Sequence, residues 1–420
     1  MKGVLLLQVK RVAMLSLHTS PLEQPGSGDA GGMNVYVRSV AVELAKAGVE
    51  VEIFTRAWDP AQPAAVELAP GVTVRHIDAG PRRRIAKESL PGLAPELASG
   101  VADLHPFLAN RHFDVIHSHY WVSGTAGLAV SRAWNLPLVH TMHTMARVKN
   151  LQLQPGEKLE PQVRIDGEQE IVEGATRLIA NTSTEAGELE SLYGADPRAV
   201  DVVAPGVDLQ VFSSRGSAAA RAGLGVPADV FHIVFAGRIQ PMKGPQVLVR
   251  AAAELQARRP DIPLRISILG AGSGSEVLEL QPLVDSLGLN AHVALYPPVE
   301  AAVLADWFRA ADVVAVPSFS ESFGLVALEA QACGTPVLAA NVGGLPKAVS
   351  HGRTGLLVDG HDSARWSAEL ERLYDDAGLR RALGYGAAVH ASAFGWKRTA
   401  QLTNQSYRQA AEQFSTQSVR

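Results

Sequence analysis

The 420-residue sequence contains one cysteine, Cys333, and so lacks the thiol pairs that a disulfide framework needs. A disulfide-stapled secreted scaffold is excluded, and a zinc site built on several cysteines is disfavoured. Aromatic residues make up only 6% of the chain and charged residues 19%, whereas 47% of the residues are hydrophobic. That apolar content is sufficient for compact folding and argues against wholesale disorder.

Long apolar runs are also missing, since no stretch of about 18 uncharged apolar residues occurs, and we expect no transmembrane helix. Residues 1–17 are apolar, but Lys10 and Arg11 interrupt them and no small-residue cleavage site follows before His18, so we expect no signal peptide. A net charge of -4 argues against a dedicated nucleic-acid binder. These features favour a cytoplasmic protein and leave room for a small basic pocket that binds an anion.

Short apolar runs alternate with stretches of helical periodicity, and the alternation restarts near residue 230. The expected strands of the first set are Arg11–Leu17, Val49–Thr55, Asp114–His117, Pro137–His140 and Arg177–Asn181, with helices at Met33–Ala47, Ser123–Trp134, Glu157–Thr176 and Ser183–Tyr193. The expected strands of the second set are Phe231–Gly237, Leu264–Gly270, His292–Tyr296, Asp312–Pro317, Pro336–Ala340 and Gly355–Val358, with helices at Gln246–Ala257, Glu276–Leu287 and Leu325–Cys333. This alternation predicts two doubly wound, Rossmann-like α/β domains with parallel sheets, and ligands bound beyond the carboxyl ends of the strands.

The break between the two sets lies near Pro205–Gly206, and the small-residue stretch Ser213–Arg221 is typical of a linker. The proline-rich segment Trp58–Pro70 is expected to be a loop. We therefore predict an N-terminal domain over residues 1–205, a C-terminal domain over 206–395, and a last segment over 396–420 that is helical and frays at its end.

A glycine-rich segment, Gly28–Asn34, leads from the first predicted strand into a helix. Glycines there let backbone N–H groups approach an anionic ligand at the helix N-terminus. Gly26, Gly28 and Gly31 match the dinucleotide spacing, but a long loop separates them from the strand, which weakens the match. An ordinary glycine-rich turn explains the segment equally well.

Arg238 and Lys243 lie five residues apart in a turn that follows the first strand of the second set. Both can reach one diphosphate, Arg by bidentate hydrogen bonds and Lys as a point charge. The alternative is a solvated pair of surface charges. The turn is not a Walker loop, because no glycine-rich run precedes the lysine.

Two carboxylates stand eight positions apart in the segment 317–330. Glu321 lies in a loop after a predicted strand, and Glu329 lies in an otherwise apolar helix where an unpaired carboxylate is costly. Sugar hydroxyls would satisfy such a carboxylate. The alternative is one glutamate on a helix surface and one at a helix cap.

Together the Gly237–Gly244 turn, the two spaced glutamates and the Gly334–Val337 strand resemble retaining glycosyltransferases of family four. The resemblance covers nearly the whole chain and implies the GT-B fold, a nucleotide-sugar donor and a last helix that crosses back to the first domain. One departure is Lys347, where many members of the family have Glu after the Gly-Gly-x-Pro sequence.

Motifs of the N-terminal half narrow the resemblance to the branch of this family that acts in mycothiol biosynthesis in actinobacteria. These motifs are His18–Pro21, Gln24–Gly26, Gly28–Asn34, His117–Trp121 and His140–Ala146. The resemblance implies transfer of N-acetylglucosamine from UDP-GlcNAc to 1D-myo-inositol 3-phosphate, and a homodimer. A different acceptor, UDP-GlcNAc epimerisation and binding without turnover remain as alternatives.

The resemblance also implies roles for individual residues. Arg238 and Lys243 would bind the diphosphate, Glu329 the ribose, and Glu321 the transferred sugar. The remaining donor contacts would come from Gln24, Pro25, Gly32, Val299, Phe323, Gly324 and Leu325. The catalytic set would be Arg238, Lys243, Glu321 and His143, the last beside the anomeric centre.

The acceptor phosphate would lie among Lys87, Tyr120, Thr144 and Arg164, and the inositol ring would contact His18, Asp29, Ala30, Gly31, Gly32, Met33 and Asn34. The resemblance implies no essential cofactor. It suggests a peripheral magnesium ion near Phe308, Arg309, Ala311 and Thr335, held mostly by backbone carbonyls because only Thr335 has a side-chain oxygen.

Overall fold

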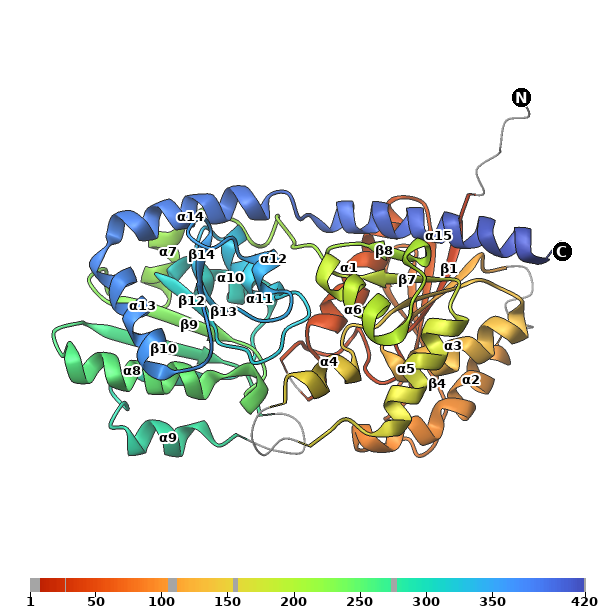
Figure 1. The fold of residues 1–420 in the computed structure, drawn as a ribbon, viewed down its shortest axis with the longest axis horizontal. Helices are drawn as coiled ribbons and strands as arrows, with labels where there is room; N and C mark the ends of the chain where they lie inside the picture. Colours follow the sequence, from red (N-terminus) through yellow and green to blue (C-terminus); the bar gives the residue numbers. More distant parts are fainter. Residues whose placement is uncertain (1–7, 27, 105–111, 154–157, 273–277, 419–420) are drawn as a thin grey trace, which may run out of the picture. The chain divides into compact units, whose positions relative to one another are not determined.

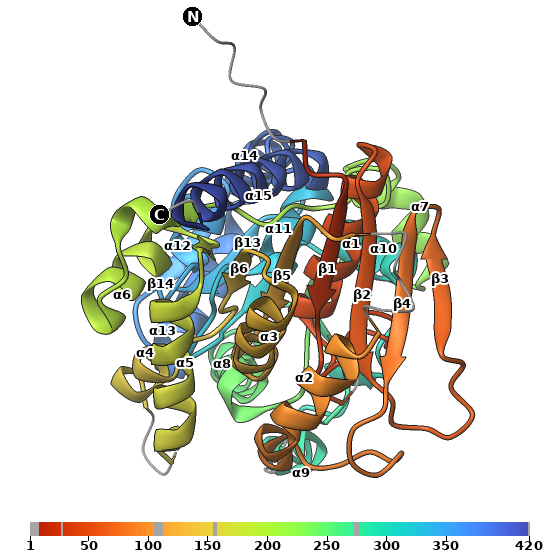
Figure 2. The same ribbon diagram turned by 90° about the vertical axis from the view of Figure 1, so that its right-hand side faces the viewer.

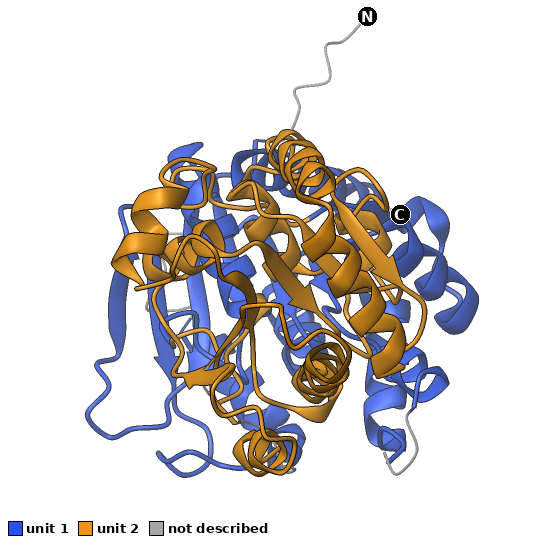
Figure 3. Ribbon diagram, turned by 90° about the vertical axis from the view of Figure 1, so that its left-hand side faces the viewer, with its two compact units in different colours: residues 1–23, 33–204, 396–420 blue, residues 24–32, 205–395 orange. Residues whose placement is uncertain are grey.

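The computed structural model describes residues 8–26, 28–104, 112–153, 158–272 and 278–418 (Figure 1). The chain divides into two compact units, coloured separately in Figure 3. Unit 1 contains residues 1–23, 33–204 and 396–420, and unit 2 contains residues 24–32 and 205–395. The glycine-rich segment 24–32, which we had placed in the N-terminal domain, thus packs with the C-terminal half of the chain.

Unit 1 is built on an eight-stranded sheet with the order β3-β4-β2-β1-β5-β6-β7-β8. Its strands are β1 Arg11–Leu15, β2 Glu50–Arg56, β3 Ala65–Ala69, β4 Val72–Ile77, β5 Val115–His119, β6 Leu138–Thr141, β7 Arg177–Ala180 and β8 Val200–Val202. Neighbouring strands run parallel except β3 and β4, which are antiparallel. The central strands β1 and β5 are buried along their whole length, as expected for a parallel sheet covered on both faces.

The helices of unit 1 cover this sheet (Figure 2). They are α1 Gly32–Lys46, the 3-10 helix η1 Lys87–Leu93, α2 Ala94–Ala102, α3 Trp121–Trp134, α4 Ala146–Leu151, α5 Gln162–Gly174, α6 Ser183–Tyr193, the 3-10 helix η3 Pro197–Ala199 and α15 Trp396–Ser418. The helix α3 packs on β1, β5 and β6, and α15 packs on β5, β6 and β7. The last helix therefore belongs to the same core as the N-terminal strands.

Unit 2 is built on a six-stranded parallel sheet with the order β11-β10-β9-β12-β13-β14. Its strands are β9 Phe231–Ala236, β10 Leu264–Leu269, β11 Val293–Tyr296, β12 Val313–Val316, β13 Val337–Ala340 and β14 Gly355–Val358. Its helices are α7 Ser217–Gly223, the 3-10 helix η4 Pro241–Lys243, α8 Pro245–Arg258, α9 Leu280–Ser286, α10 Ala301–Ala310, α11 Leu325–Ala332, α12 Leu345–Ala348, α13 Ser363–Asp375 and α14 Ala377–Ala391. The predicted pattern of two doubly wound domains is confirmed.

Three details of the sequence prediction were wrong. The segment Trp58–Pro70 is not only a loop, because its second part forms β3, and the neighbouring β4 was missed as well. Val200–Val202 adds the short edge strand β8. The proposed linker Ser213–Arg221 contains the start of helix α7, whose alanines favour a helix once Ala220 is buried.

Some predictions extend beyond what the structure describes. The beginnings of the predicted helices Glu157–Thr176 and Glu276–Leu287 fall at residues 154–157 and 273–277, outside the described ranges. Residues 1–7, which belong to the apolar N-terminal segment, also lie outside them. None of the helices in the described ranges combines the length and apolar character that a membrane span requires.

Candidate active site

The cationic turn of unit 2 starts where β9 ends and continues into η4. Gly244 closes it in the left-handed region (φ 73°), and an added Cβ there would stand 2.0 Å from the Pro317 carbonyl oxygen. Only glycine allows this approach of two backbones. The Phe319 N–H donates to the Met242 carbonyl at 2.8 Å, so the turn is fixed against the loop that follows β12.

This approach brings together two of the predicted donor residues. Lys243 Nζ lies 2.7 Å from Glu321 Oε2, and both side chains keep about a fifth of their surface exposed. Ser318 Oγ lies 3.5 Å from the same carboxylate oxygen. Arg238, at the start of the turn, makes no ion pair with the carboxylates of the described residues. The turn therefore holds one paired and one unpaired cation.

The N-terminus of α11 lies next to these cations in the sequence and offers free backbone donors. Gly324 is its N-cap (φ 100°), and the N–H groups of Phe323, Gly324 and Leu325 make no hydrogen bond within the described residues. The backbone of this loop packs directly against Gly343, where an added Cβ would stand 2.2 Å from the Glu321 carbonyl oxygen. Free N–H groups at a helix N-terminus favour an anion.

Glu329 lies one turn further along α11 and is 9% exposed. Burial raises the pKa of its carboxyl group to about 8. Its side chain makes no hydrogen bond within the described part of the chain, which leaves its oxygens free to accept from hydroxyl groups. A buried carboxyl without a partner is costly, and such sites are typical of ligand binding.

The glycine-rich segment 24–32 packs beside the same groups within unit 2. Gln24 Nε2 donates to the Val299 carbonyl at 2.9 Å, so this carbonyl, predicted to contact the uracil, already accepts a protein hydrogen bond. An added Cβ on Gly32 would lie 3.2 Å from Leu325 Cδ1, and one on Gly31 would lie 3.7 Å from Arg238 Nε. The predicted donor residues on these separate segments, including Pro25, thus belong to one unit.

The four residues predicted to bind the acceptor phosphate meet in unit 1, around the ring of Tyr120. Lys87 Nζ lies 4.7 Å and Arg164 Cζ lies 5.2 Å from its centroid. Arg164 also donates to Thr144 Oγ1 at 3.0 Å and to the Thr144 carbonyl at 3.1 Å. Four segments that are far apart in the sequence therefore place two cations and a hydroxyl together.

Arg164 is 3% exposed and is held by two glutamates that we did not predict from the sequence. Its guanidinium donates to Glu168 Oε1 at 2.7 Å and pairs with Glu160 Oε2 at 2.9 Å. Burial disfavours the charge, but these carboxylates and Tyr120 outweigh it and keep the pKa of Arg164 above its ordinary value. The spacing of four residues on either side of Arg164 was the signal available in the sequence.

The residues predicted to contact the inositol ring are divided between the two units. His18 lies in unit 1, with its ring centroid 4.4 Å from that of Tyr120, and Met33 lies there too. Asn34 is buried, and its Nδ2 donates to Thr19 Oγ1 at 2.9 Å and to the Ser20 carbonyl at 2.7 Å, so its amide holds the preceding loop. Asp29, Ala30, Gly31 and Gly32 pack with unit 2.

Two non-glycine residues with positive φ follow neighbouring strands of unit 1. Tyr120 (φ 69°) follows β5, and His143 (φ 61°) follows β6. Such backbone strain in non-glycine residues concentrates at functional sites. Burial lowers the pKa of His143 to about 3, so its imidazole is neutral at physiological pH.

The four residues predicted to hold magnesium lie together around the C-terminal end of α10. The Phe308 carbonyl accepts from the Ala311 N–H at 3.2 Å and from Thr335 Oγ1 at 2.6 Å. The Arg309 carbonyl accepts from Ser217 Oγ at 2.7 Å. The oxygens that could coordinate magnesium here are neutral and already take part in hydrogen bonds. The set lacks the carboxylates that magnesium prefers.

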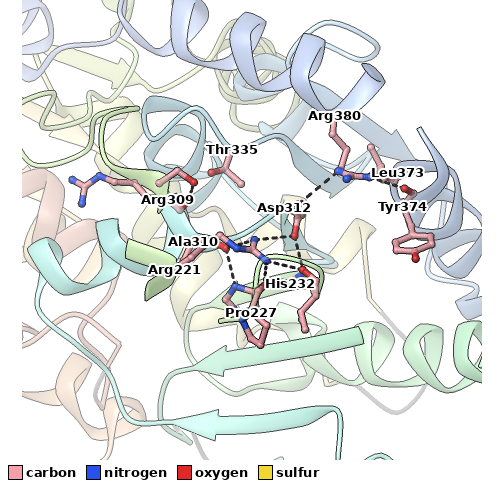
Figure 4. A network of polar contacts seen from close by, with 12 residues as sticks. Arg221, Pro227, His232, Arg309, Ala310, Asp312, Thr335, Leu373, Tyr374 and Arg380 are labelled. Atoms are coloured by element: carbon pink, nitrogen blue, oxygen red, sulfur yellow. Dashed lines mark hydrogen bonds and ion pairs between the residues drawn. The ribbon is translucent and has the colours of Figure 1, made fainter. Parts of the chain in front are cut away.

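The network next to this position is built from contacts between protein groups (Figure 4). Arg221 donates to the Ala310 carbonyl at 3.0 Å and to Asp312 Oδ2 at 3.1 Å. In the described part of the chain, no group of three or more His, Cys, Asp or Glu side chains could hold a metal ion. The fit to magnesium is poor, and we assign no chemical step to it.

Comparison with known sequences agrees with this geometry. A family model described as "Glycosyltransferase Family 4" matches residues 30–211, and one described as "Glycosyl transferases group 1" matches residues 217–390. The chain is 59% identical over 406 residues to the D-inositol 3-phosphate glycosyltransferase of Arthrobacter sp. (strain FB24), with 97% of this chain and 96% of the relative covered. The corresponding protein of Streptomyces scabiei (strain 87.22) is 54% identical, with 95% and 91% covered.

Solved structures show the same fold. Sucrose-phosphate synthase from Thermosynechococcus elongatus superimposes with a TM-score of 0.87 at 32% identity, covering 95% of this chain and 98% of that one. WaaG, a glycosyltransferase involved in lipopolysaccharide biosynthesis, has a TM-score of 0.71 at 17% identity, with 94% and 98% covered. The chain therefore has the GT-B fold and belongs to the glycosyltransferase family that includes the D-inositol 3-phosphate glycosyltransferases.

Proposed function

We propose that this glycosyltransferase moves N-acetylglucosamine from UDP-GlcNAc to 1D-myo-inositol 3-phosphate with retention of the α configuration. The products would be 1D-myo-inositol 2-acetamido-2-deoxy-α-D-glucopyranoside 3-phosphate and UDP, and the reaction would be the first step of mycothiol biosynthesis. The names of the relatives support an inositol phosphate acceptor. The donor and the pathway step are inferred from the sequence motifs.

One observation carries the proposal, namely the convergence of Lys87, Thr144 and Arg164 on Tyr120. A phosphate monoester needs cations and hydroxyl donors on one side, and this set supplies both. The Lys87 ammonium makes no ion pair with the carboxylates of the described residues, so its charge is available to the ligand. An acceptor without a phosphate would leave this charge unused.

The donor would bind to unit 2. Arg238 and Lys243 would hold the diphosphate together with the free N–H groups at the start of α11. Glu329 would accept hydrogen bonds from the ribose hydroxyls, and Glu321 would bind the sugar after giving up part of its contact with Lys243. Each role uses a group that the structure leaves open or only weakly paired.

Transfer would proceed on the face of the sugar from which UDP leaves. The acceptor hydroxyl oxygen forms the new bond to the anomeric carbon as the bond from that carbon to the diphosphate oxygen breaks. The hydroxyl proton passes to the leaving diphosphate oxygen. Arg238 and Lys243 stabilise the negative charge that develops there, which is the contribution that accelerates the step.

The same proposal includes a cytoplasmic location and a homodimer, and both stay predictions. Function is tested by measuring UDP release from UDP-GlcNAc with and without 1D-myo-inositol 3-phosphate, with the product identified by mass. We expect rapid release only with the acceptor, and a product larger by one N-acetylhexosamine. Release that ignores the acceptor would indicate hydrolysis or epimerisation, and an absence of turnover would disprove the proposed acceptor or donor.

A further inference from the structure

Unit 1 contains a group of buried histidines that the proposed reaction does not yet explain. His119 is the last residue of β5 and is fully buried, and its Nδ1 lies 3.0 Å from His143 Nε2. The two rings are 5.2 Å apart between centroids. The residue predicted to lie beside the anomeric centre is therefore hydrogen-bonded to a second histidine from the neighbouring strand.

The hydrogen-bonding pattern indicates which histidine donates. His119 Nε2 is buried and has no partner within the described residues. Because a buried N–H without an acceptor is costlier than a buried lone pair, the stable form of His119 has its proton on Nδ1. His143 Nε2 must then accept, which places the proton of a neutral His143 on Nδ1.

His143 leaves that second nitrogen unused. Its Nδ1 makes no hydrogen bond within the described part of the chain, and the residue keeps 9% of its surface exposed. The positive φ of His143 holds the side chain in a conformation that few non-glycine residues adopt. A strained backbone and a single hydrogen bond together define where Nδ1–H points.

The packing behind the pair is apolar and aromatic. Tyr36 on α1 meets both rings edge-on, at 5.8 Å from His119 and 5.2 Å from His143, and also meets Trp396 on α15 at 5.8 Å. The ring of His117 lies 4.0 Å from that of His119, and its own nitrogens bond to Tyr407 Oη at 2.7 Å and Thr141 Oγ1 at 2.9 Å. Tyr36 on α1 and His117 on β5 thus restrict the movement of the His119 ring.

We propose that His119 is a positioning residue for glycosyl transfer, which donates its Nδ1 proton to His143 Nε2 and fixes the ring orientation and tautomer of His143. His143 then presents a neutral Nδ1–H donor to the transferred sugar. Burial supports this state, because it lowers the pKa of both imidazoles and keeps them uncharged. The inference rests on the proposed function, since it assumes that His143 meets the sugar.

Steady-state kinetics of two substitutions test the hydrogen bond. His119→Leu keeps an apolar side chain of similar volume but loses the donor, and we expect kcat to fall about ten- to thirtyfold. The KM for inositol phosphate should stay within about threefold, because the phosphate set is untouched. His119→Asn restores a donor near the position of Nδ1 and should recover kcat to within about threefold of the wild-type value.

The matched control is His140→Leu. His140 is equally buried on the adjacent strand β6, and its Nδ1 bonds to Ser118 Oγ at 2.8 Å rather than to His143. We expect this variant to keep kcat within about threefold while its melting temperature falls as much as that of His119→Leu. Equal losses of kcat in both leucine variants would overturn the proposal, since a general effect of buried histidines would explain them.

Nitrogen-15 NMR of the imidazole rings gives a readout that does not depend on turnover, with His143→Asn used to assign the signals. We expect one Nδ1–H tautomer of His143 in the wild-type protein and a mixture of tautomers in His119→Leu. An unchanged tautomer, or an altered tautomer with unchanged kcat, would overturn the proposal. Failure of the wild-type protein to transfer sugar would instead refute the proposed function, and the tautomer would still report on the pair.

Discussion

The two predicted binding regions of this protein hold their cations in opposite ways. In unit 2, Lys243 is paired with Glu321, a carboxylate predicted to bind substrate, and both remain partly exposed. In unit 1, Arg164 is buried between Glu160 and Glu168. The predicted acceptor region therefore has a preset charge arrangement, whereas the predicted donor region has a pair that we expect a diphosphate to replace.

This difference distinguishes charged residues that orient their neighbours from charged residues that are available to bind a ligand. Arg164 is 3% exposed and its charge is balanced by carboxylates, so we expect its main role to be the orientation of Thr144 and Tyr120. Within the described residues, the Lys87 ammonium contacts the Tyr120 ring and makes no ion pair, and in the proposed function it supplies the excess positive charge. Substitutions should therefore separate stability from affinity in unit 1 and combine binding with catalysis in unit 2.

The largest effect is expected for Arg164→Met. Glu168 is fully buried, and removal of Arg164 leaves its carboxylate without a counter-charge, with only the Ala146 N–H and the Tyr193 hydroxyl as donors among the described residues. The free energy of unfolding should therefore fall by about 3–5 kcal/mol. Lys87→Met should change that free energy by less than about 1 kcal/mol while raising the KM for inositol phosphate about ten- to hundredfold. Chemical denaturation and acceptor kinetics measure the two quantities.

Arg132→Met is the control for Arg164→Met, because Arg132 is exposed on α3 and makes no ion pair with the described residues. It should leave both the free energy of unfolding and the KM unchanged. Equal stability of Arg164→Met and wild type would contradict the organising role of Arg164.

Lys243→Ala should lower kcat about 10²–10³-fold, because the leaving diphosphate loses a cation where its charge develops. Glu321→Gln should tighten binding of UDP alone, since the carboxylate that competes for Lys243 is gone. Arg258→Ala, which breaks an exposed ion pair with Glu371 in the same unit, serves as the control and should change neither quantity. Calorimetric titration with UDP tests whether the Lys243–Glu321 ion pair must break before UDP binds. Weaker UDP binding by Glu321→Gln would show that the pair does not compete with UDP.

Much of this arrangement was predictable from the sequence because it depends on local patterns. Apolar runs gave most strands of both sheets to within one or two residues, as for β14. The edge strands β3 and β8 were missed because their residues are only half-buried and their apolar signal is weak. Strand pairing with a neighbour stabilises them, and no periodicity in the segment itself indicates it.

Sequence motifs predicted the site residues, but they did not predict the residues that hold those side chains in place. Glu160 and Glu168 act through Arg164, and His119 through His143, and these contacts depend on how α5, β5 and β6 pack. Asn34 shows the converse, since a residue predicted to contact inositol uses its amide to hold a loop. Sequence patterns indicate the chemistry of a site, but the residues that orient it depend on tertiary contacts.

A smaller effect is expected from pH in the donor region. Burial raises the pKa of Glu329 from 4.5 to about 8, so the carboxyl is mostly protonated at neutral pH without ligand. Ribose hydroxyls donate to the carboxylate, so donor binding favours the ionised form and the Kd for UDP should fall up to tenfold per unit as pH rises from 6 towards 8. Glu329→Gln should bind UDP more weakly and with a flat profile between pH 6 and 9, and a wild-type Kd that is flat over this range would contradict the assignment.

The raised pKa of Glu329 also makes the contribution of this residue to stability depend on pH. In the unfolded chain the carboxyl ionises near 4.5, whereas in the folded chain it stays protonated until about 8. The contribution of Glu329 to stability must therefore decrease as pH rises between these values. The buried histidines, whose pKa values are lowered, contribute with the opposite sign below about pH 6.5, so the test is the difference between variants: from pH 5 to pH 8, Glu329→Gln should gain stability relative to the wild type. Denaturation midpoints at pH 5 and pH 8 measure the difference.

The smallest effect is expected from removal of metal ions. The oxygens around Phe308 and Thr335 are neutral and hydrogen-bonded to each other. In the proposed mechanism, Arg238 and Lys243 supply the positive charge that the leaving diphosphate needs. Treatment with EDTA should therefore change kcat by less than about twofold, and added magnesium should restore nothing. A large loss of activity that magnesium reverses would mean that a divalent cation shares the diphosphate charge, and Lys243→Ala would then be expected to cost far less than a hundredfold.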